Sequence, residues 1–343
     1  MKILSIQRIT RHLLLVIAVF AVLAVGGIAV VIQPFVKPVE SQPPQVDPIQ
    51  LEAHVRYLSV NLHPRSFEQH RKIDLAAQYI FNQIEATGGK ASIQEVLVEG
   101  EIYKNIVARY GSDTGPKIVI GAHYDSHADT HVEILGKRSY TLNTHTPGAD
   151  DNASGVAGLL ELARLLARTP PKHPVELVAY TLEEPPHFRT EHMGSAWHAR
   201  SLRAANREVS LMISLEMIGY FSDEPESQRF PLPAMSRLYS DRGNFIALVG
   251  KLSDFATMRQ VKSIMTGAVN LPIYSINAPT LIPGIDFSDH LSYWNEGIPA
   301  LMITDTAFLR NKNYHQAGDT YDKLDYGRMK KVVQAVYAIT QLY

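Results

Sequence analysis

Short apolar runs alternate with helical patterns along residues 51–343, and this alternation constrains the fold more than any other feature of the chain. Strands are predicted at residues 93–98, 105–110, 117–120, 175–180, 211–215 and 300–303. Helices are predicted at residues 73–84, 155–167, 195–205, 242–266 and 329–342. Apolar strands separated by helices are typical of a parallel sheet covered on both faces. We therefore expect an α/β fold, a three-layer sandwich with a mostly parallel central sheet.

Polar side chains follow several of these strands at the edge where ligands gather in such sheets. Three of the predicted strands run into His123, Glu183-Glu184 and Glu216. Two more groups lie in loops, Asp151 before a predicted helix and His290 in a run of acidic residues. Taken singly, each group also fits a structural role, because Asp favours helix N-caps and paired glutamates are common in solvated loops.

Together, these groups contain the ligands that a pair of metal ions requires. The chain has 14 His and no Cys, so a metal must be held mainly by imidazoles and carboxylates. One bridging carboxylate would let five such residues bind two zinc ions about 3.5 to 4 Å apart. The five candidate ligands are His123, Asp151, Glu184, Glu216 and His290. Asp125 would orient the ring of His123, and one of the paired glutamates could serve as a general base.

The N-terminal region predicts a membrane anchor. Residues 13–32 are uncharged and mostly aliphatic, and a helix of that length spans roughly 30 Å, the thickness of the hydrocarbon core. Residues 1–12 carry Lys2, Arg8 and Arg11 and no acid, which favours a cytoplasmic N-terminus and an extracytoplasmic catalytic domain. A cleaved signal peptide is the alternative, with residues 24–26 as its cleavage site. We expect a single-pass protein of the cell membrane.

Residues 33–50 contain five prolines and are predicted to form a stalk ahead of one domain at residues 51–343. Without the three basic residues of the tail, the formal net charge of −1 becomes −4. A mildly acidic domain has no overall field that attracts nucleic acid, so we expect no nucleic-acid partner.

The order and spacing of the motifs resemble metallopeptidase family twenty-eight, which includes secreted leucine aminopeptidases and glutamate carboxypeptidase, with glutaminyl cyclases as relatives. The resemblance is carried by GAHYDS, PGADDNASG, TLEEPP, SLEMIGY, DFSDH and NYHQAGDTYDKLDY, between residues 117 and 326. It implies a zinc-dependent exopeptidase that acts on peptides, most simply an aminopeptidase.

The resemblance also implies a role for each candidate residue. His123 and Glu216 would hold one zinc ion, Glu184 and His290 the other, and Asp151 would bridge both. Glu183 would be the general base for a water activated by the two zinc ions, and Asp125 the acid that orients the first histidine. Glu216 departs from the aspartate of the best-known aminopeptidases, and its longer arm could alter that metal site. Residues of the substrate site are expected at Tyr220, Tyr314 and His315.

Two other functions remain open from the sequence. A glutaminyl cyclase is an acyltransferase that resembles this family but works with one zinc ion, whereas the presence of both His123 and Glu216 favours two metals and hydrolysis. Some relatives are receptor-like ectodomains without metal ligands. The long segment between Asp125 and Asp150, which contains residues 133–138, is expected to border the substrate cleft.

Overall fold

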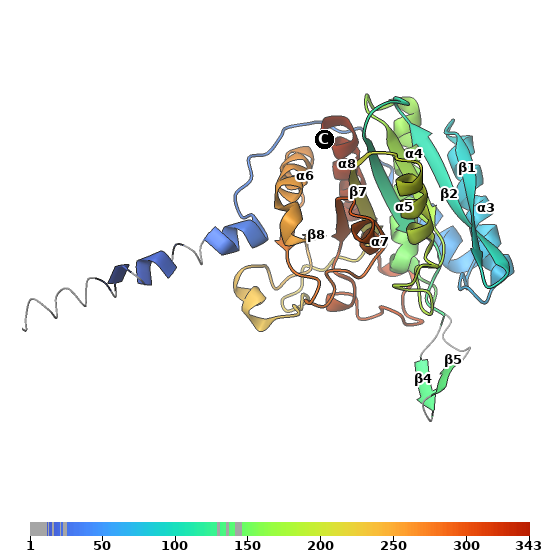
Figure 1. Ribbon diagram of the computed structural model, residues 1–343. Coiled ribbons are helices and arrows are strands. Elements are labelled where there is room, and N and C mark those ends of the chain that lie inside the picture. The colour runs from blue at the N-terminus through green and yellow to red at the C-terminus, as the bar shows by residue number, and fades with distance from the viewer. Residues whose placement is uncertain are drawn as a thin grey trace, which may run out of the picture.

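The computed structural model describes residues 26–128, 131–134, 137–140 and 146–343, together with residues 12, 14, 15, 17–20 and 22. Its centre is an eight-stranded sheet in the order β1-β2-β6-β3-β7-β10-β8-β9 (Figure 1). The strands are β1 (Ala91–Val98), β2 (Glu101–Tyr110), β3 (Lys117–His123), β6 (Val175–Tyr180), β7 (Val209–Glu216), β8 (Ile246–Gly250), β9 (Ile273–Asn277) and β10 (Ala300–Thr304). Parallel pairing joins β6 to β3, β3 to β7, β7 to β10 and β8 to β9. The sheet is therefore mixed and mostly parallel.

Helices cover both faces of this sheet, as expected for a three-layer α/β sandwich. One face carries α2 (Pro48–Arg56), α3 (His70–Ala86), α4 (Gly155–Arg168), α6 (Phe255–Ala268) and α8 (Tyr326–Leu342). The other face carries α5 (Gly194–Ala204) and α7 (His290–Asn295). Successive side chains of β3 face opposite helix layers: Ile118 and Ile120 pack toward the first group of helices, and Val119 packs toward the second.

The four central strands β6, β3, β7 and β10 all run in the same direction. Their carboxyl ends therefore lie at one edge of the sheet, where the chain leaves each strand into a loop. His123 is the last residue of β3, Glu216 is the last residue of β7, and Glu183 follows β6 after two residues. The parallel topology thus brings together polar residues that lie far apart in the sequence.

The helix predicted at residues 242–266 is wrong in its first half. Residues Ile246–Gly250 form strand β8, which pairs with β10 and β9, and α6 begins only at Phe255. Every residue of β8 is buried. A short, wholly apolar run has no periodicity that separates a buried strand from a buried helix, and pairing partners distant in the sequence decided between them.

The N-terminal predictions fall largely outside the described residues. Within residues 1–32 the structure describes only part of the chain, and that part is helical. Among all described residues, no helix is long and apolar enough to cross a membrane. The cytoplasmic tail at 1–12, the anchor at 13–32 and the extracytoplasmic location therefore remain predictions from the sequence.

The proline-rich segment predicted as a stalk packs against the domain. The Val39 amide donates to the Ser263 carbonyl of α6, and the Ser41 amide donates to the Gly267 carbonyl. Gln334 of α8 donates to the Pro44 carbonyl, and the Val46 side chain is buried in the core. Helix α2 then begins at Pro48, inside the predicted stalk. Proline gives this segment an extended backbone, and backbone amides and carbonyls of the segment form hydrogen bonds with α6 and α8.

The long segment between Asp125 and Asp150 contains an antiparallel hairpin of β4 (His131–Ile134) and β5 (Lys137–Tyr140). In Figure 1 this hairpin extends away from the body of the domain. Its flanking residues 129–130 and 141–145 lie outside the described residues. The expectation that this segment borders the substrate cleft stays a prediction.

Glu176 is a buried acid near the amino end of β6, at the edge of the sheet opposite to the carboxyl ends that carry His123 and Glu216. Its carboxylate lies 2.7 Å from Arg109 Nε, 3.0 Å from Lys117 Nζ and 3.1 Å from His198 Nε2. Burial by itself would raise the pKa of Glu176, but His198 and Lys117 hold it below its usual range. Because the folded-state pKa is depressed, this carboxylate stabilises the fold above the unfolded pKa of about 4.3, and the stabilisation is lost as the pH falls.

We expect the substitution Glu176→Gln to destabilise the domain without changing its chemistry. Removing one partner of a buried ion pair costs about 3 kcal/mol, which would lower the melting temperature by roughly 5 to 10 °C at neutral pH. Thermal melting of Glu208→Gln, an exposed glutamate nearby, provides the control. The difference between Glu176→Gln and the unsubstituted protein should shrink toward pH 4. A difference independent of pH would show that the charge of Glu176 is not its cause.

Candidate dinuclear metal site

His123, Asp151 and Glu216 form a buried triad at the carboxyl edge of the sheet. His123 Nε2 lies 3.3 Å from Asp151 Oδ1 and 3.4 Å from Glu216 Oε2. Asp125 Oδ1 lies 3.4 Å from the other ring nitrogen, Nδ1, as expected for the residue that orients this ring. Neither ring nitrogen of His123 makes a hydrogen bond within the described part of the chain. A buried imidazole with its nitrogens facing carboxylates at this spacing fits a metal ligand.

A second triad consists of Glu184, His315 and His127, whose ligand atoms lie within 4.8 Å of one another. His315 Nε2 lies 3.4 Å from Glu184 Oε2 and 3.1 Å from Asp151 Oδ2. The two oxygens of Asp151 therefore face different triads, Oδ1 toward His123 and Oδ2 toward His315. This is the geometry of a bridging carboxylate.

The spacings are compatible with zinc. Zinc lies about 2.05 Å from imidazole nitrogen and carboxylate oxygen, and the edge of a tetrahedron of that radius is about 3.3 Å. The five nitrogen–oxygen separations within the two triads and between them and Asp151 fall between 3.1 and 3.4 Å. His123, Asp151 and Glu216 could thus hold one ion, and Glu184 and His315 a second ion that shares Asp151.

Glu183 lies beside the first triad, with Oε2 3.8 Å from His123 Nε2. Burial raises the pKa of Glu183 well above its usual range, and the charges of Glu216 and Glu184 raise it further while His123 lowers it. Its neighbour Glu184 points to the second triad, and the Glu184 amide donates to Asp125 Oδ2 at 3.0 Å. The two adjacent glutamates therefore contact different groups, Glu183 the first triad and Glu184 the second.

The loop that carries Asp151 is held by buried polar groups. Gly148 has a φ of 60°, and a Cβ there would lie 2.3 Å from the Asp151 carbonyl oxygen, so only glycine fits. Arg65 is fully buried and donates to the carbonyls of Pro147 and Gly148. The carboxylate of Asp319 accepts hydrogen bonds from the amides of Asp150 and Asp151. These contacts fix the position of the bridging side chain.

Negative charge dominates the site. Burial alone would lower the pKa of His123, but Glu183 and Glu216 together with Asp125 and Asp151 raise it well above its usual value. Burial also opposes protonation of His315, yet Glu184 and Asp151 raise its pKa to about 10. The surrounding carboxylates thus favour the protonated, positively charged form of both imidazoles. Divalent cations would neutralise the same carboxylates and displace these protons.

His290 lies outside both triads of the described residues, so the structure does not bring it to the position predicted for it. The ring is fully buried, its Nε2 lies 2.8 Å from the Ile285 carbonyl, and its edge packs on Trp294 with ring centroids 4.5 Å apart. Burial lowers the pKa of His290 to about 4. His290 begins helix α7, whose packing turns the side chain into the core. The preceding Ser288 reaches the site instead, because its hydroxyl donates to Glu216 Oε2 at 2.7 Å.

His315 occupies the position that the sequence assigned to His290. It was expected in the substrate site with Tyr314, whose ring stacks on that of His315 at a centroid distance of 3.7 Å. Tyr220 packs its partly buried ring against the core. His127 was not predicted, although its spacing gave a signal, since His123, Asp125 and His127 alternate directly after a strand.

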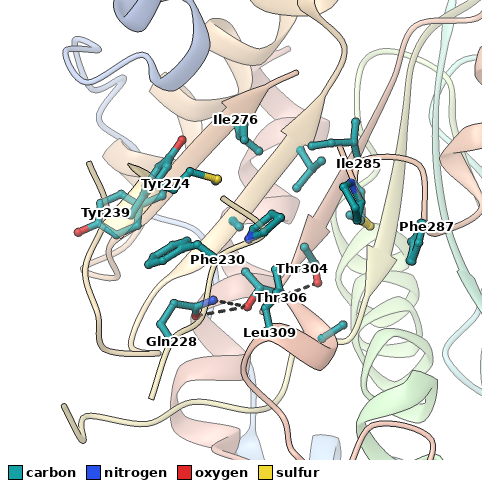
Figure 2. A pocket seen from close by; sticks show the side chains of 18 of the residues that line it. Gln228, Phe230, Tyr239, Tyr274, Ile276, Ile285, Phe287, Thr304, Thr306 and Leu309 are labelled. Carbon is teal, nitrogen blue, oxygen red and sulfur yellow. Dashed lines mark hydrogen bonds between the residues drawn. The ribbon is translucent and has the colours of Figure 1, made fainter. Parts of the chain in front are cut away.

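An apolar pocket opens beside Glu216, which forms part of its lining. Figure 2 shows aromatic rings of Phe230, Tyr239 and Tyr274 on one side and Ile285 and Phe287 on the other. The pocket holds about 730 Å³, its open mouth included. Its polar members are few, and one of them, Gln228, is hydrogen-bonded to Thr306. This lining suits an aliphatic or aromatic side chain.

The sequence matches known peptidases over most of its length. The model of peptidase family M28 matches residues 105–340. The chain is 53% identical to an uncharacterized protein, YfbL of Escherichia coli (strain K12), over 91% of this chain and 92% of that protein. It is 25% identical to leucine aminopeptidase 1 of Ajellomyces capsulatus (strain H88) over 74% of this chain, and the match spans only 60% of that relative.

Solved structures share the fold. LapB from Legionella pneumophila superposes with a TM-score of 0.64 at 22% identity, over 86% of this chain and 71% of that chain. A glutaminyl cyclase from Bacteroides thetaiotaomicron superposes with a TM-score of 0.61 at 19% identity, over 87% of this chain and 98% of that chain. At these identities the likeness extends to the fold alone.

Proposed function

From the premise that the chain belongs to peptidase family M28, we propose that it is a zinc-dependent aminopeptidase. The observation that carries this proposal is the pair of triads that share Asp151, with Glu183 beside one of them. Zinc ions bound there would polarise the scissile carbonyl and make an attacking water more acidic. This combination of groups is what hydrolysis of a peptide bond requires.

Glu183 would move the proton in this reaction. It is buried and stands 3.8 Å from His123 Nε2 without belonging to either triad, so its carboxylate is available to a water between the triads. In the proposed mechanism Glu183 takes the proton of the attacking water and later delivers it to the leaving amine. Asp125 keeps the ring of His123 in place, and Ser288 does the same for the carboxylate of Glu216.

Incubation with a mixed peptide library, with and without a chelator, tests this function. We expect stepwise loss of residues from the N-terminus, read by mass spectrometry, and no loss after chelation. Loss from the C-terminus would contradict the aminopeptidase assignment. Conversion of an N-terminal Gln to pyroglutamate with one zinc ion per chain would favour a glutaminyl cyclase instead.

The apolar pocket beside Glu216 supports a preference for substrates with a large apolar side chain at the cleaved residue. We expect Phe230→Glu to lower kcat/KM for a leucyl substrate by about 10-fold or more, since pocket contacts of this kind are worth 10- to 200-fold. An alanyl substrate, which fills less of the pocket, should lose less. Phe35→Glu, at an aromatic residue that is 84% exposed, is the matched control. Equal losses for both substrates would exclude this pocket from side-chain selection.

A further inference from the structure

His127 lies in the second triad, although it directly follows the GAHYDS motif and belongs to none of the motifs that carry the family resemblance. Its Nδ1 is 3.2 Å from Glu184 Oε2, which is also 3.4 Å from His315 Nε2. The two imidazole rings stack with centroids 3.7 Å apart and planes 10° apart. His127 is only 8% exposed. One carboxylate oxygen is thus approached by two imidazoles, that of the buried His127 and that of His315, whose side chain is 22% exposed.

The chain after β3 is fixed so that His127 faces this triad. The Arg65 guanidinium donates to the Tyr124 carbonyl, the Arg65 amide donates to Ser126 Oγ, and the Ser126 amide donates to the Arg65 carbonyl. The segment from His123 to His127 is therefore held at its second and fourth residues, Tyr124 and Ser126. His123 points to the first triad and His127 to the second, so a five-residue segment reaches both.

We propose that His127 is an additional protein ligand of the second metal ion. This inference rests on the proposed dinuclear site. The Nδ1 to Oε2 separation of 3.2 Å matches the edge of about 3.3 Å expected between two ligands of one zinc ion. The second ion then has four protein ligands, namely Asp151, Glu184, His315 and His127, whereas the first has three, His123, Asp151 and Glu216.

This difference makes the two sites unequal. Structural zinc sites have four protein ligands, whereas catalytic sites keep a position open for water or substrate. The open position therefore belongs to the ion held by His123 and Glu216, which is also the side on which Glu183 lies. The ion at His127 is therefore the more tightly bound of the two, and the ion at His123 is the one that exchanges more readily.

Metal titration of the full chain tests the proposal. The protein is stripped with chelator and titrated with Zn²⁺ in the presence of a competing chelator, and in parallel with Co²⁺, whose visible absorption reports the ligand set. We expect two ions per chain with unequal affinities. His127→Gln should weaken the tighter site by about 100-fold or more, beyond the 10- to 100-fold that loss of a hydrogen-bonding partner behind a ligand costs. It should also change the cobalt spectrum.

The choice of Gln separates a ligand from a hydrogen-bonding partner. Its amide can still donate to Glu184 but is a poor zinc ligand, so unchanged affinity and spectrum in His127→Gln would overturn the proposal. His127→Ala provides a second variant, and His173→Ala, at an exposed histidine, is the matched control that should behave like the unsubstituted protein. Circular dichroism verifies that each variant is folded.

Failure of the inference and failure of the proposed function give different results. If the unsubstituted protein binds two ions and cleaves peptides while His127→Gln binds both ions equally well, only the role of His127 is wrong. If the unsubstituted protein binds fewer than two ions, the dinuclear site itself is wrong, and the role of His127 falls with it.

Discussion

Glu183→Gln is expected to lose nearly all peptide hydrolysis while keeping its fold and its two zinc ions. The substitution removes the group that takes up the proton but leaves the size of the side chain unchanged. Loss of a positioned general base costs typically 10²- to 10⁴-fold in rate. The measurement is kcat on a leucyl substrate, together with zinc content by elemental analysis.

The control for Glu183→Gln is Glu191→Gln, an exposed glutamate in the same loop region. It should retain full activity. Glu183 lies outside both triads, so zinc content should not change in the Gln variant. Retained hydrolysis would assign the proton transfer to another group, whereas lost zinc would make Glu183 a ligand.

His315→Ala is expected to weaken the second metal site and to lose most of the activity. Its Nε2 faces both Glu184 and the bridging Asp151, so no other imidazole of the described residues replaces it at both carboxylates. Activity should fall by more than 100-fold, since even loss of a group behind a ligand costs 10- to 100-fold. Zinc content and kcat/KM at fixed metal concentration measure the two effects.

The matched comparison is His290→Ala, which removes the histidine that the sequence predicted as the ligand. His290 contacts Ile285 and Trp294 in the core, so its loss should lower the melting temperature. Its zinc content should stay at two ions per chain. The opposite pattern, with zinc lost from His290→Ala and kept in His315→Ala, would restore the predicted ligand set and refute the site described above.

Four of the six residues in the two triads were predicted as ligands from the sequence, because each lies at the end of an apolar strand or before a helix. His123 and Glu216 are the last residues of β3 and β7, Glu184 follows β6, and the carboxyl ends of these parallel strands lie at one edge of the sheet. Glu216, despite its longer arm, reaches 3.4 Å from His123 Nε2 with Ser288 as its support. The different contacts of Glu183 and Glu184 likewise follow from their successive positions after β6.

The structure brings His315 to the second triad in place of the predicted His290, although His290 and not His315 has an acid beside it in the sequence. His290 and His315 both lie beyond the last predicted strand end that carries a ligand, and no periodic pattern ranks one loop above the other. The choice depends on where each loop runs in space. The packing of α7 buries His290 against Trp294, and the loop before α8 brings His315 to Asp151.

The sequence by itself determined the alternation of strands and helices, the family, and the carboxylates and imidazole at the strand ends. The hydrophobic pattern of short stretches of chain predicts each strand and helix, and the alternation of the two predicts the parallel sheet. Tertiary structure alone decided that β8 is a strand, that residues 33–47 pack on α6 and α8, and that His315 and His127 face Glu184. Each of these depends on contacts between residues far apart in the chain, and a local pattern does not specify which partner a buried group will find.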